Sequence, residues 1–124
     1  MNRWRIPPWL EEVVVARDTS CIYCRSAFAG PGGERRLRRS WEHIVNDESL
    51  IKRENIALCC IGCNASKGTK SLSAWLESKY CHRRGISAQS IAAVAQAELS
   101  MQLSTDRSAY SGDIGKLPMG PRST

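Results

Sequence analysis

The sequence lacks long apolar runs and has few large side chains with which to build a core. No segment approaches the roughly 18 to 20 consecutive apolar residues that a membrane-spanning helix requires. The charged N-terminal start is not followed by the apolar stretch of a secretory signal peptide. We therefore expect a cytoplasmic protein in a reducing environment, without a membrane span. One phenylalanine, three tyrosines and four tryptophans are its only aromatic residues of these types, so we expect a modest apolar core.

Size and charge narrow the class further. A chain of 124 residues suits one domain and is too short for two of the usual size. Lys and Arg outnumber Asp and Glu by 18 to 12, for a formal net charge of +6. A surplus of this size favours polyanionic partners such as nucleic acids. The indication is weak by itself, because many basic proteins bind no nucleic acid.

Six cysteines are the most distinctive part of the composition. In a reducing compartment they are not expected to form three disulfides. Two pairs have C-x-x-C spacing, and two thiolates spaced in this way can bind one zinc ion from a single turn. Two such turns complete a tetrahedral shell. The sequence therefore predicts a structural Zn²⁺ site at Cys21, Cys24, Cys60 and Cys63, which clamps the start of the domain to its middle.

Neighbouring residues leave the ligand set open. Cys59 could replace Cys60, although the spacing of the first pair favours Cys60 and leaves Cys59 as a small buried residue. Cys81 and His82 could replace one pair, but their place late in a predicted helix favours a buried thiol and an exposed imidazole. A redox C-x-x-C is disfavoured, because no thioredoxin-like βαβ pattern accompanies it. A complete four-cysteine shell has no open position, so catalysis would need a second site.

Turn residues and apolar periodicity predict an α+β domain made of short elements. We expect it to span 1–104, with a core over about 21–70 and a helical part over 71–104. A mobile tail is expected over 105–124, where Ser, Gly and Pro accumulate. The predicted elements are a proline-led helix over 8–18, strands over 40–45 and 56–59, a helix that begins at Asn64 and is interrupted by Gly68, a helix over 71–84 stopped by Gly85, and a last helix over 87–103.

A histidine lies between the two C-x-x-C pairs, in the segment Trp41-Glu42-His43-Ile44-Val45. After a loop comes Asn55-Ile56-Ala57-Leu58-Cys59-Cys60-Ile61-Gly62-Cys63-Asn64-Ala65-Ser66-Lys67-Gly68. Together these residues resemble the ββα-metal core of the HNH endonucleases. In that family an acidic residue and a histidine lie on the first strand, an asparagine sits in the loop, and C-x-x-C leads into a helix that begins with His or Asn followed by x-x-Lys-Gly. The resemblance covers roughly residues 21–70.

The resemblance implies a metal-dependent endonuclease that hydrolyses phosphodiester bonds in DNA. His43 would be the general base that activates water, because its neutral ring titrates near working pH. Glu42 and Asn64 would hold a catalytic divalent ion, Mg²⁺ or Mn²⁺, through oxygen atoms. Asn55 would orient the His43 ring by a hydrogen bond. The family more often has Asp in place of Glu42. It often has His in place of Asn64, so this sequence resembles an HNN-type variant. The longer side chain of Glu42 leaves room for Asp47 or a water molecule to share the ion.

Each of these residues also has an ordinary structural interpretation. His43 could be a packed imidazole, Asn55 a turn residue and Asn64 a helix N-cap. Successive strand residues point to opposite faces, so Glu42 and His43 share one pocket only where a bulge or twist re-aims one of them. The co-occurrence of all these residues within one zinc framework favours catalysis.

Basic residues flank the predicted site on both sides, where they form either a solvated face or a phosphate-binding surface. The resemblance implies nucleic acid, in the first place double-stranded DNA, as the partner. Such side chains bind phosphates without reading base sequence. Two other functions stay open: a zinc-dependent module that binds nucleic acid without cutting it, and a structural zinc domain that docks another protein through its helical part. Small HNH-like proteins often come from phages or bacteria, where some assist genome packaging, a role that enters by analogy only. The predicted phosphate contacts are Arg35, Arg36, Arg38, Arg39, Lys67 and Lys70.

Overall fold

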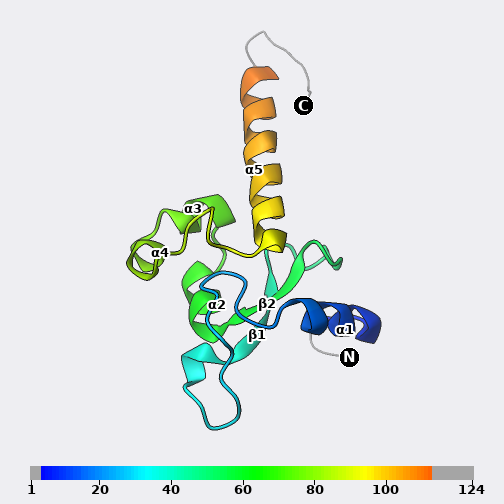
Figure 1. Ribbon diagram of the computed structural model, residues 1–124. Coiled ribbons are helices and arrows are strands. Elements are labelled where there is room, and N and C mark those ends of the chain that lie inside the picture. The colour runs from blue at the N-terminus through cyan, green and yellow to red at the C-terminus, as the bar shows by residue number, and fades with distance from the viewer. Residues whose placement is uncertain (1–3, 113–124) are drawn as a thin grey trace.

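A two-stranded antiparallel sheet lies at the centre of the protein, and helices surround it (Figure 1). The computed structural model describes residues 4–112, the side chains of 105–112 excepted. This mixed arrangement of helices and sheet agrees with the predicted α+β class. In chain order the elements are α1 (Pro8–Arg17), the 3-10 helix η1 (Arg35–Leu37), β1 (Arg39–His43), β2 (Ile56–Cys60), α2 (Ile61–Lys67), α3 (Leu72–Leu76), α4 (Lys79–Arg84) and α5 (Ala93–Gly112).

The hairpin of β1 and β2 separates two apolar clusters. The strands pair continuously, from Arg39 opposite Cys60 to His43 opposite Ile56, and every residue of β2 is buried. Because side chains alternate along a strand, Ala57 and Cys59 join the cluster that also contains residues of α2, α3 and α5. Ile56 and Leu58 instead join the cluster with α1. A residue's position on β1 therefore decides which cluster it faces.

Helix α1 begins as the sequence predicts, with proline in its first turn, and ends one residue before Asp18. The buried carboxylate of Asp18 accepts a hydrogen bond from the backbone N–H of Leu58 at 3.1 Å. Arg17 contacts both carboxylate oxygens, at 2.7 and 2.8 Å, and donates to the carbonyl of Ile56 at 2.8 Å. The end of α1 is thus attached to β2 by polar contacts as well as by apolar packing.

Helix α2 follows β2 without a loop, and its start differs from the prediction. The helix begins at Ile61, and its N-cap is Cys60, whose Sγ accepts a hydrogen bond from the N–H of Cys63. The prediction that Asn64 begins and caps this helix is therefore wrong: a thiol takes the capping role, and Asn64 lies inside the helix. Gly68, with a φ of +52°, ends the helix, as expected from its freedom at positive φ.

The single helix predicted over 71–84 is divided in two. Ser71 caps α3, and Ser78 caps α4 by accepting a hydrogen bond from the N–H of Cys81. Serine competes for backbone donors in this way and so favours a new helix start over helix continuation. Gly85 ends α4 in the left-handed conformation with a φ of +68°, at the predicted position.

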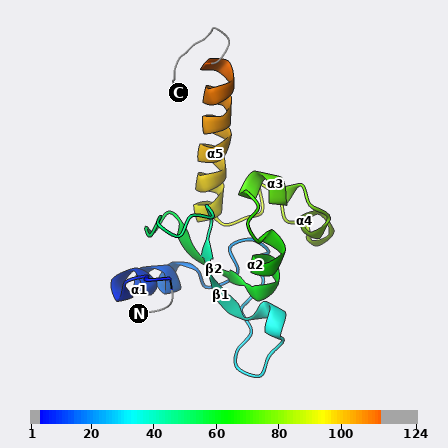
Figure 2. The ribbon, with the colours of Figure 1, turned by 180° about the vertical axis from the view of Figure 1, so that it is seen from behind.

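Helix α5 starts later and ends later than predicted. It begins at Ala93 and continues past the expected end at Leu103 to Gly112. Ala95 and Leu99 are buried against the body, after which the helix projects away from it (Figures 1 and 2). The remainder of the expected mobile tail, 113–124, lies outside the described residues. None of the helices in the described part is both long and apolar enough to cross a membrane.

Candidate functional site

Two turns that are distant in sequence bring four cysteine sulfurs together. Cys21 and Cys24 lie in the turn after α1, Cys60 ends β2, and Cys63 lies in the first turn of α2. Their four Sγ atoms lie within 4.8 Å of one another, and the Sγ atoms of Cys24 and Cys60 are 3.8 Å apart. Zn–S bonds of about 2.3 Å in a tetrahedron place neighbouring sulfurs about 3.8 Å apart. The cluster therefore fits a zinc ion in ligand number, ligand type and size.

Hydrogen-bond donors surround these sulfurs and stabilise negative charge on them. The backbone N–H groups of Tyr23 and Cys24 both point to the Sγ of Cys21 at 3.4 Å. The hydroxyl of Tyr80, from α4, donates to the Sγ of Cys63 at 3.4 Å. The Arg84 guanidinium in turn lies 3.9 Å from the centre of the Tyr80 ring. Helix α4 thus contributes an outer layer to the cysteine cluster.

The crowded thiols shift one another's pKa in opposite directions. A hydrogen bond with the thiol of Cys21 lowers the pKa of Cys60 to about 6, and the same neighbour lowers the pKa of Cys24. The pKa values of Cys21 and Cys63 are raised by hydrogen bonds with the other thiols. Zinc binds cysteine as the thiolate, so binding of a metal ion would release the protons that these thiols carry.

The structure also settles which cysteines belong to this cluster. Cys60 belongs to it, and Cys59 is buried but is not one of its members; burial raises the pKa of the Cys59 thiol well above 9.0. Cys81 is buried and His82 is exposed, both as predicted. The predicted set of four ligands is therefore the set that the structure brings together.

His43, the predicted base, occupies the last position of β1 on the face that packs against α1. It is 8% exposed, and the edge of its ring meets Trp4 with the ring centroids 5.0 Å apart. Its Nε2 atom is buried and has no hydrogen-bond partner among the described residues. Burial lowers the pKa of His43 below its ordinary 6.5, against the opposing effect of Glu42, Glu48 and Asp47. The ring is therefore neutral at physiological pH and retains an unused nitrogen.

Glu42 points to the other face of β1. Its Oε2 accepts a hydrogen bond from the hydroxyl of Tyr23 at 2.7 Å and forms an ion pair with Lys67 Nζ at 3.0 Å. Because the strand pairs continuously with β2, no bulge re-aims either residue. The expected pocket shared by His43, Glu42 and Asn64 is therefore not formed, and strand alternation is the physical reason.

Asn64 lies beside β1 on the same face as Glu42. From its position in α2, its Nδ2 donates to the hydroxyl of Ser40 at 2.9 Å and to the carbonyl of Trp41 at 3.0 Å. Both amide hydrogens are thus used, while no described residue donates to its Oδ1. Carboxylate and amide oxygens are ligands that hard cations prefer. In donor type, Glu42 and Asn64 fit Mg²⁺ or Mn²⁺, although the Glu42 carboxylate already neutralises Lys67.

Asn55 does not bind the His43 ring. Its Oδ1 accepts from the N–H of Val45 at 2.6 Å, and its Nδ2 donates to the carbonyls of Val45 and Leu50 at 3.2 and 3.1 Å. The predicted role of Asn55 as the partner of the imidazole is corrected accordingly. The residue instead fixes the loop that follows His43.

The predicted phosphate contacts divide into exposed and buried groups. Lys67 is 1% exposed, and its ammonium bonds to the carbonyl of Ile44 and to Glu42, so its predicted contact with phosphate is corrected. Arg36 is exposed but pairs with Glu34 at 2.6 Å. The other exposed members of the set are Arg35, Arg38, Arg39 and Lys70.

Sequence reasoning missed Tyr23 and Tyr80. Tyr23 lies within the first C-x-x-C pair, which predicts its closeness to the cluster but not the contact of its hydroxyl with Glu42. Tyr80 lies within the helix that the sequence predicts over 71–84. No spacing rule indicates that a tyrosine on such a face reaches a thiol across the molecule.

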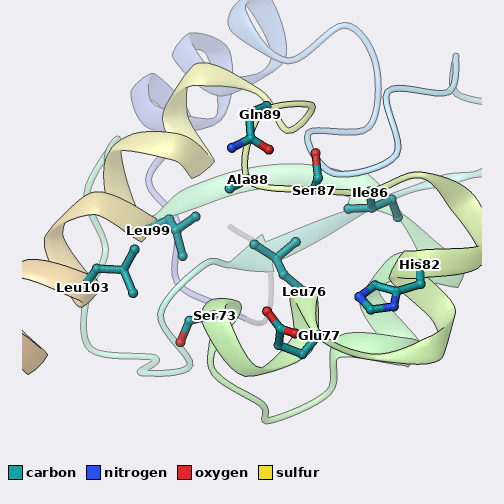
Figure 3. A pocket seen from close by; sticks show the side chains of 10 residues that line it. All are labelled: Ser73, Leu76, Glu77, His82, Ile86, Ser87, Ala88, Gln89, Leu99 and Leu103. Carbon is teal, nitrogen blue, oxygen red and sulfur yellow. The ribbon is translucent and has the colours of Figure 1, made fainter.

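A cavity of about 350 Å³ lies apart from these residues, among α3, α4 and α5 (Figure 3). The apolar wall of the cavity includes Leu76, Ile86 and Leu99. His82 of α4 also lines the cavity. None of the predicted site residues lines it.

Comparison of the chain with protein-family models, with curated proteins and with solved structures gives no match.

Proposed function

We propose that the protein is a metal-dependent DNA endonuclease of the HNH kind, in which His43 is the general base. The observation that carries the proposal is the Nε2 atom of His43, which is buried and has no partner among the described residues. Folded proteins leave few buried polar atoms unpaired, so packing alone does not account for this nitrogen. A general base needs a neutral ring with a free acceptor atom, and burial keeps this ring neutral.

The arrangement of the elements supports the same function. The hairpin β1–β2 leads directly into α2, and the cysteine cluster attaches the turn after α1 to the start of α2. This order of strand, strand and helix is the one that the HNH-like residues 21–70 imply. An ion in the four-cysteine cluster would be structural, because a complete shell has no open position for substrate.

Each remaining residue has a defined task. His43 accepts the proton of the attacking water. A divalent ion, Mg²⁺ or Mn²⁺, would stabilise negative charge on the phosphate. Glu42 and Asn64 are the predicted oxygen donors for this ion, but they lie on the other face of β1 from His43, so holding the ion beside this base would require the end of β1 to rearrange. The exposed arginines near η1 bind the DNA backbone. His43 is 8% exposed and its ring packs against Trp4, so the side chains that bury Nε2 must move aside before substrate reaches this atom.

The two histidines of the chain provide a matched test. Supercoiled plasmid is incubated with purified protein and Mg²⁺, Mn²⁺ or a chelator, and cleavage is followed on gels. We expect His43→Ala to lower the cleavage rate by about 10²–10⁴-fold, the usual contribution of a general base. His82→Ala, which removes the exposed histidine of α4, is expected to cleave like the wild type. Equal cleavage by wild type and His43→Ala would refute the mechanism.

A second function, nucleic-acid binding without cleavage, is favoured by the contacts of Glu42. Its carboxylate is paired with Lys67 and points away from the face of His43. The same plasmid assay separates the two functions. A binding module would shift DNA in gels, and its affinity would fall with added salt, as phosphate contacts require. It would not cleave the plasmid with Mg²⁺, with Mn²⁺ or with chelator.

A further inference from the structure

Lys67 has its charged end buried inside the protein. The residue is 1% exposed. Its Nζ donates to the carbonyl of Ile44 at 3.0 Å and pairs with Glu42 Oε2 at 3.0 Å. Glu42 and Ile44 are the residues immediately before and after His43. One buried cation therefore holds the strand on both sides of the proposed base.

Two further contacts fix the same stretch of chain. Tyr23, which is fully buried, donates to the same carboxylate oxygen of Glu42 at 2.7 Å, and its ring is held by Trp75 with centroids 4.9 Å apart. Beyond Ile44, Asn55 binds both the N–H and the carbonyl of Val45. The chain around His43 is thus held through the Glu42 side chain and through the backbones of Ile44 and Val45, while the imidazole itself keeps a free nitrogen.

Stability alone does not explain a buried ion pair at this position. Removing two charges from water is costly, and apolar replacements of buried ion pairs are often as stable or more stable. Lys67 also ends α2, the helix that begins in the cysteine cluster. Its contacts therefore connect the cluster, through one short helix, to the segment that carries His43.

We infer that Lys67, together with Tyr23 acting through Glu42, positions His43 for the reaction. This inference rests on the proposed nuclease function. A buried positioning residue does not touch substrate, so its loss lowers kcat and leaves KM unchanged. A phosphate-binding lysine would show the opposite pattern, because its loss weakens substrate binding.

Lysine-to-methionine variants test this difference in plasmid cleavage. We expect Lys67→Met to lower kcat by about 10²-fold, the effect of a small misplacement of a reacting group, at unchanged KM. Lys70→Met removes an exposed lysine close by and is expected to raise KM. Lys79→Met, an exposed lysine of α4, is the control and is expected to match the wild type. A raised KM at unchanged kcat in Lys67→Met would overturn the inference.

A second readout does not depend on cleavage. Diethyl pyrocarbonate acylates accessible neutral imidazoles, and mass spectrometry distinguishes His43 from His82. In the wild type and in Lys79→Met, we expect His82 to react and His43 to be protected. In Lys67→Met the segment is released, and His43 is expected to react several times faster. If the wild type does not cleave DNA, the nuclease proposal fails, while the acylation measurement still tests whether Lys67 positions the His43 ring.

Tyr23→Phe provides an independent test of the inference if the Lys67→Met variant does not fold. It removes one hydroxyl from Glu42 and keeps the ring that packs on Trp75. We expect a smaller fall in kcat, an unchanged KM and faster acylation of His43. Unchanged kcat together with unchanged protection of His43 in Tyr23→Phe would overturn the inference, as would unchanged protection in a folded Lys67→Met.

Discussion

The pKa of His43 is set by two opposing effects, burial and nearby carboxylates. Burial beside Trp4 disfavours the charged ring, while the carboxylates of Glu42, Glu48 and Asp47 favour it. Burial is the larger effect, so the pKa of the ring lies below 6.5. A lowered pKa favours the neutral ring, which is the form that can accept a proton, at neutral pH.

This lowered pKa predicts the pH dependence of cleavage. The neutral ring accepts a proton from water, so the rate should be constant at neutral pH and fall only as pH drops through a value below 6.5. The contribution of His43 to folding stability depends on pH in the same direction, and also falls as the pH is lowered. The unfolded state takes up this proton first, so the contribution of His43 is complete above 6.5 and lost as pH falls toward the folded-state pKa. Cleavage rates and urea unfolding measured from acid to neutral pH would check both, and a cleavage midpoint at or above 6.5 would contradict this account.

At this scale the sequence predicts identities better than contacts. The four cysteine ligands follow from spacing, because C-x-x-C restricts both thiols to one turn. The contacts of Lys67 and Asn55 do not follow, because a lysine beside other basic residues gives no sign that its charge is buried. Whether an asparagine bonds to a ring or to the backbone likewise depends on the path of the loop.

Among the elements, the contact of α1 with β2 offers a separable test of the fold. Asp18→Ala leaves the buried N–H of Leu58 without its acceptor. We expect the free energy of unfolding to fall by about 1–3 kcal/mol, the usual cost of an unsatisfied buried donor. Urea unfolding measures the change. Glu12→Ala, an exposed acidic residue of the same helix, is the control, and an equal loss in both variants would show that the buried contact is not the cause.

Element boundaries were predictable where apolar periodicity sets them. Helix α1 and the hairpin lie close to their predicted positions, since proline, alternation and β-branched residues act locally. The start of α2 and the division at Ser78 were missed, because both depend on capping by side chains. A thiol that caps a helix and also belongs to a metal site has no distinct sequence pattern.

For the whole molecule, the cysteine cluster is expected to be the main source of stability. Zinc-finger peptides gain about 10–16 kcal/mol of apparent binding energy that appears as folding energy. We expect a strong chelator, or Cys21→Ser, to lower the melting temperature severely, with bound metal and circular dichroism measured together. Cys81→Ala removes a buried thiol outside the cluster and is expected to retain the metal. Normal melting of metal-free protein would contradict this expectation.

The projection of α5 also affects how the molecule moves in water. At 1.5 Å per residue, a helix of 20 residues is about 30 Å long, and the buried residues among its described side chains, Ala95 and Leu99, lie in its first turns. A sphere with a rod attached rotates more slowly about the axes perpendicular to the rod than about the rod itself. Nuclear spin relaxation of backbone amides should therefore depend on the orientation of each N–H bond relative to α5.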